Sequence, residues 1–109
     1  MSLKPDLGSL MRFITMRYRF VPEAYPSLGC LPASHKLPFA VNHSVLHMAK
    51  SLCKMASECE SFDHGGPISE GVLKEATVKM LINTLKLADE LGMSPDDFCQ
   101  LIPELMKSK

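Results

Sequence analysis

Four side chains that could bind an anion recur at helical spacing between residues 43 and 54. They are His43, His47, Lys50 and Lys54, separated by four, three and four residues. At about 100° per residue their directions fall within about 60° of one another, so a helix would place them in one stripe. Two ammonium groups and two imidazoles on one face suit a phosphate or a nucleotide. The alternative is an ordinary polar face in contact with water.

A second polar stripe follows at the same kind of spacing, with Glu75, Lys79, Asn83 and Lys86. Lys79 and Asn83 would extend the anion site. Asn83 is a weak helix former among Leu and Ile, so we expect it to hydrogen-bond across a helical bundle or to a ligand. The alternative is a solvated face with an i,i+4 ion pair between Glu75 and Lys79.

A metal site is the competing chemistry for these residues. His43 and His47 stand at i,i+4, a spacing that can share a metal, but the lysines beside them argue against a cation. A zinc site from Cys30, His35, His43 and His47 fits no standard spacing. The carboxylates that remain as weak metal candidates are Glu58, Asp63 and Glu75.

The elements that position the stripes are predicted helices. Residues 42–62 form an amphipathic helix, with an apolar face nearly opposite the His/Lys stripe. That apolar face consists of Val45, Met48, Ala49, Leu52, Ala56 and Cys59. Residues 69–91 form a second long helix, with Ser69 as N-cap, Gly92 after its end and an apolar band wide enough to pack on two sides. Ser94 then caps a short C-terminal helix.

The N-terminal part is a shorter element and a long connection. Residues 6–20 fit both helical and strand spacing, and we favour a helix because no strand partner follows. Prolines at 22, 26, 32 and 38 predict an irregular connection over residues 21–41. The expected organisation is one all-α domain over residues 1–109, with its helical core in residues 42–109.

Composition narrows the function classes. The 109 residues carry 12 basic and 12 acidic side chains, and this zero net charge argues against a nucleic-acid binder that uses Arg12, Arg17 and Arg19 with the lysines. No apolar run is long enough for a membrane span, and residues 1–13 lack the apolar core of a signal peptide, so we expect a cytoplasmic protein. Mean hydropathy of +0.05 at zero net charge suggests apolar surface covered by another subunit.

The segment Leu85-Lys86-Leu87-Ala88-Asp89-Glu90-Leu91-Gly92-Met93-Ser94 resembles the end of the last core helix in MazG-like proteins. These all-α nucleoside triphosphate pyrophosphohydrolases share the pattern Leu-Ala-x-x-Leu-Gly before a short acidic helix. The resemblance covers residues 40–105. It implies a helical bundle completed by oligomerisation to a dimer or tetramer, nucleotide substrates, and Mg²⁺ held by carboxylates.

The chain departs from the family at those carboxylates. Counted from Leu87-Ala88, the Glu-x-x-Asp positions fall on Ala76 and Lys79, and a one-residue slip recovers only Glu75. The Glu-Glu-x-x-Glu positions fall on Leu46, His47 and Lys50.

The resemblance therefore implies a divergent pyrophosphohydrolase, or a nucleotide or phosphate binder that has lost metal-dependent catalysis. In this second case His47, Lys50 and Lys79 would take the place of Mg²⁺. The rival hypothesis is a non-enzymatic interaction module whose partner surface is the helix at 69–91.

Overall fold

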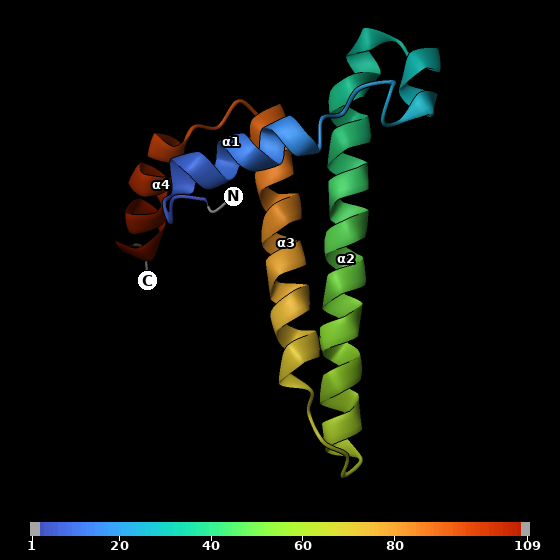
Figure 1. The fold of residues 1–109 in the computed structure, drawn as a ribbon, viewed down its shortest axis with the longest axis vertical. Helices are drawn as coiled ribbons and strands as arrows, with labels where there is room; N and C mark the ends of the chain where they lie inside the picture. Colours follow the sequence, from blue (N-terminus) through green and yellow to red (C-terminus); the bar gives the residue numbers. More distant parts are fainter. Residues whose placement is uncertain (1–2, 108–109) are drawn as a thin grey trace.

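The computed structural model describes residues 3–107, which form four α-helices and two short 3-10 turns (Figure 1). The elements are α1 (Leu7–Arg17), η1 (Pro26–Cys30), η2 (Ala33–His35), α2 (Lys36–Asp63), α3 (Glu70–Glu90) and α4 (Pro95–Lys107). No strand occurs within residues 3–107, so the predicted all-α class is confirmed, and the N-terminal element is a helix as expected. No helix in this range is long and apolar enough to cross a membrane.

Local capping explains where the helices begin. Asp6 accepts a hydrogen bond from the Ser9 backbone N–H at 2.8 Å, and the Ser69 hydroxyl accepts one from Val72 N–H at 3.3 Å. Ser94 and Asp97 cap each other's backbone N–H groups, at 3.2 and 2.8 Å. Each bond satisfies a donor that the first turn of a helix leaves unpaired. The N-caps predicted at Ser69 and Ser94 are confirmed.

The start of α2 differs from the prediction. The helix begins at Lys36 rather than at residue 42, so the irregular connection is shorter than residues 21–41. Pro38 lies in the first turn of α2. A proline costs nothing there, because its missing N–H would have no partner inside the helix.

The helices pack as a long pair with a shorter crossing helix. α2 and α3 run side by side, and α1 crosses the C-terminal part of α3 (Figure 1). The core lies at that crossing, where Met11 and Ile14 of α1 meet Leu85 and Ala88 of α3. α4 contacts α1 at the far edge.

The side of α2 that packs against α3 is not its apolar side. Its buried residues are the small Ala40, Ser44 and Ser51, which let the two helices approach closely. Of the six residues of the predicted apolar face only Met48 is half-buried, and the other five are exposed. Most of this face is therefore uncovered in the part of the chain that the structure describes.

Candidate functional site

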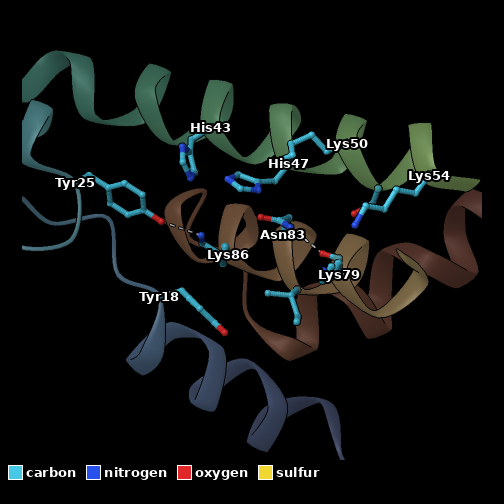
Figure 2. A pocket seen from close by; sticks show the side chains of 11 residues that line it. Tyr18, Tyr25, His43, His47, Lys50, Lys54, Lys79, Asn83 and Lys86 are labelled. Carbon is cyan, nitrogen blue, oxygen red and sulfur yellow. Dashed lines mark hydrogen bonds between the residues drawn. The ribbon is translucent and has the colours of Figure 1, made fainter. Parts of the chain in front are cut away.

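A pocket of about 470 Å³ opens between α2, α3 and the chain that follows α1 (Figure 2). All six residues predicted for an anion site line it: His43, His47, Lys50, Lys54, Lys79 and Asn83. Five lining residues were not among those predicted: Tyr18, Tyr25, Ser51, Ile82 and Lys86. The two polar stripes face each other across the pocket, because the small buried side chains of α2 allow it to lie close to α3.

Lys86 occupies the inner end of the pocket and is only 7% exposed. Its Nζ donates a hydrogen bond to the Tyr25 hydroxyl at 3.1 Å. The same ammonium lies 5.3, 4.9 and 5.7 Å from the ring centroids of Tyr18, Phe20 and Tyr25, within the range of cation–π attraction. No carboxylate in residues 3–107 forms an ion pair with it. The pocket thus holds a nearly buried positive charge without a counter-ion.

An aromatic cluster supports this end of the pocket. The segment after α1 folds back over the start of α2, so that the Tyr25 ring stacks on Phe20 at 5.2 Å and meets His43 edge-on at 4.8 Å. Phe39, on α2, stacks on His43 at 5.9 Å and also meets Tyr25 edge-on at 5.7 Å. The ring of His47 lies 4.5 Å from that of His43. Both imidazoles point toward α3, as Figure 2 shows.

The electrostatic surroundings oppose protonation of both histidines. Burial lowers the pKa of His43, and the neighbouring His47 and Lys86 lower it further. Burial also lowers the pKa of His47, with the charges of Lys50 and Lys86 adding to the effect. These surroundings therefore favour the neutral form of each imidazole, and an anion in the pocket would favour the protonated form.

Asn83 is buried on the α3 side of the pocket. Its amide N–H donates to the Lys79 carbonyl oxygen at 2.8 Å. Because a carbonyl only accepts, this bond assigns the nitrogen and leaves the Asn83 side-chain oxygen as an acceptor toward the pocket. The expected hydrogen bond across the bundle is not formed, since the amide bonds its own helix.

The remaining lysines lie at the outer, exposed end of the pocket. Lys79 pairs with Glu75 at 3.1 Å, and Lys79 together with Lys54 lowers the pKa of the Glu75 carboxyl. A ligand at this end would therefore compete with Glu75 for Lys79. Lys50 and Lys54 form no ion pair with a carboxylate in the described residues.

The donor set does not fit Mg²⁺, which prefers carboxylate and water oxygens. None of the residues that line the pocket is Asp or Glu. Glu58 accepts a hydrogen bond from the Ser69 backbone N–H at 2.7 Å, and Glu75 is held by Lys79. Within residues 3–107, no three His, Cys, Asp or Glu side chains gather into a metal site. The weak candidates Glu58, Asp63 and Glu75 are thus not brought together, and neither is the Cys30, His35, His43 and His47 set.

The residues that sequence reasoning missed differ in how they could have been found. Lys86 belongs to the second polar stripe, three residues after Asn83, so its spacing was a usable signal. Tyr18 and Tyr25 lie outside the long helices, and their positions depend on the path of the chain between α1 and α2.

Comparison with known proteins gives no independent assignment. No protein-family model, no curated protein and no solved structure matches this chain. Membership in the MazG-like family therefore stays a prediction from residues 40–105.

Proposed function

We propose that the pocket binds a phosphorylated small molecule, a nucleotide or related phosphometabolite in the cytoplasm, without a metal ion. The observation that carries this proposal is Lys86, an ammonium with no carboxylate partner among the described residues, at the inner end of a pocket lined by further cations. Burying an uncompensated charge costs free energy. A phosphate placed against Lys86 would offset that cost.

The surroundings of Lys86 support a phosphate ligand in three ways. The volume of about 470 Å³ lies in the range of small-molecule sites. Lys50 and Lys54 extend the positive charge outward, which suits a chain of phosphates rather than one carboxylate. The tyrosine rings and Ile82 supply apolar walls for the rest of the ligand.

Binding is better supported than hydrolysis. A MazG-like pyrophosphohydrolase would polarise its phosphates with Mg²⁺ held by carboxylates. Lysines and histidines stand at the corresponding positions here, and lysine binds phosphate as a point charge. We therefore propose a divergent MazG-like chain in which His47, Lys50 and Lys79 replace the metal.

Isothermal titration calorimetry of the full chain tests this proposal. Pyrophosphate, AMP, ADP and ATP are titrated in EDTA and again in Mg²⁺. We expect binding in EDTA, and at least a tenfold rise in Kd for the double variant His47→Ala, Lys50→Ala. The matched control is Lys74→Ala, an exposed lysine of α3 outside the pocket.

Two results would contradict the proposal. Binding that requires Mg²⁺ would mean that carboxylates outside the pocket hold the ion. Unchanged affinity in the double variant would mean that the phosphate lies elsewhere. Release of pyrophosphate from ATP, followed by chromatography, separates an enzyme from a binder.

The second candidate function is a helical interaction module, with a second copy of the chain as the expected partner. Exposed apolar side chains favour it, among them Leu81 of α3, which is 47% exposed. Leu85 does not belong to such a surface because it packs in the core against α1. Under this hypothesis Leu81→Glu abolishes association, and no phosphate ligand changes the melting temperature.

A further inference from the structure

The outer face of α2 is apolar and has no partner within residues 3–107. Val45 and Leu52 are 51% and 58% exposed, and Val41 and Cys59 continue the same side of the helix. α2 lies at the edge of the molecule, and no other helix covers its outer side (Figure 1). A helix normally buries a face of this kind against a neighbour.

The surface area of the chain points to the same conclusion. Its accessible surface is 8065 Å², whereas a compact monomer of this mass exposes only about 6,000 Å². The surplus of about 2,000 Å² exceeds the roughly 800 Å² per partner of a standard stable interface. The Cα radius of gyration is 16.7 Å, against about 13 Å for a compact domain of this length.

We infer that a second copy of this chain covers the face, with the two α2 helices antiparallel about a two-fold axis near residue 50. Val41 of one chain then lies opposite the partner's Cys59. A two-fold contact uses the same patch on both copies, so an apolar patch meets an identical apolar patch. This inference places self-association on α2 and not on the Leu81 surface of α3 considered above, and it does not rest on phosphate binding.

The helix dipole favours the antiparallel arrangement. The basic residues of α2 lie on the side opposite Val45, so they do not meet across the proposed interface. Antiparallel packing places the negatively polarised C-terminus of each α2 beside the positively polarised N-terminus of its partner, whereas parallel packing brings like ends together.

The proposed interface leaves the phosphate pocket open. Val45 and His47 are two residues apart, which is about 200° around the helix. His47 lines the pocket, so Val45 points away from it. Interface variants can therefore be tested for association and for ligand binding separately.

Light scattering coupled to size exclusion tests the face. We expect twice the chain mass of 12.1 kDa for the natural protein and the single-chain mass for Val45→Glu, with unchanged helical circular dichroism. Val45 is exposed, so the charge should not unfold the chain. The matched control is Val78→Glu, a valine 57% exposed on α3, which should remain dimeric.

Each other outcome overturns the proposal in a distinct way. A natural protein that is monomeric at every concentration has no self-association, and a different partner then covers the face. A Val45→Glu variant that stays dimeric places the interface elsewhere. Pyrophosphate affinity measured on Val45→Glu reports on the pocket alone, so failure of phosphate binding is recognised independently.

A disulfide experiment tests the antiparallel arrangement. Cys30, Cys53 and Cys99, all free and exposed, are replaced by serine, and Val41→Cys is added to the retained Cys59. We expect a covalent dimer on oxidation, and none in the same background without Val41→Cys. A covalent dimer of the chain that keeps Cys59 but lacks Val41→Cys would overturn the antiparallel arrangement. A covalent dimer of a chain that carries Val41→Cys but lacks Cys59 would overturn it as well.

Discussion

Replacing Lys86 by methionine removes the charge at the inner end of the pocket while keeping a long apolar stem. The ammonium is nearly buried, donates a hydrogen bond to the Tyr25 hydroxyl and lies over three aromatic rings. A hydrogen bond to a charged group contributes about 1.5–3 kcal/mol. At about 1.4 kcal/mol for each factor of ten, Lys86→Met should raise the Kd for pyrophosphate about 10- to 150-fold.

The loss of affinity should come without a comparable loss of stability. Methionine fills the space of the lysine stem, so the free energy of unfolding should change by less than about 1.5 kcal/mol. The lost bond to Tyr25 is offset because an unpaired charge is no longer buried. Urea unfolding of both proteins checks this, and calorimetry in EDTA at pH 7 gives the two Kd values.

Lys74→Met is the matched control, because it removes the same charge from an exposed site on α3 that does not line the pocket. It should leave the Kd within a factor of two. The reasoning would be refuted if Lys86→Met bound pyrophosphate as tightly as the natural protein. It would also be refuted if both lysine variants lost affinity equally, since only the overall charge would then matter.

Two further predictions concern protonation and packing. The pKa values of His43 and His47 are lowered in the ligand-free fold, so the unfolded chain binds more protons than the folded one. The free energy of unfolding should therefore fall as the pH drops through the ordinary histidine value of 6.5 toward the lower pKa values of the fold. Urea unfolding from pH 7.5 to 5 measures this. Over the same pH range the affinity for sulfate, which keeps both of its charges, should rise as the imidazoles take up protons. Histidine NMR signals that do not change with pH in the presence of sulfate would contradict this. The Ser44 hydroxyl is fully buried without a hydrogen-bond partner, so Ser44→Ala should stabilise the fold by about 1–2 kcal/mol. A destabilisation in thermal unfolding would show that the hydroxyl has a partner in solution.

The helices could be read from the sequence because their signals are local. Ser69 and Ser94 cap the helices that they were predicted to cap, since a capping bond needs only residues three positions away. The sequence pattern places the start of α2 too late, because a proline such as Pro38 usually marks a break, whereas a proline in the first turn is compatible with a helix.

The members of each polar stripe were also determined by the sequence alone, because helical periodicity sets which side chains share a face. Their meeting was not, because it depends on which side of α2 packs on α3. Tertiary packing chose the side with Ser44 and Ser51 over the apolar side, since small residues allow close approach of two helices. That choice turned the imidazoles toward Lys86, and it left most of the apolar face of α2 exposed.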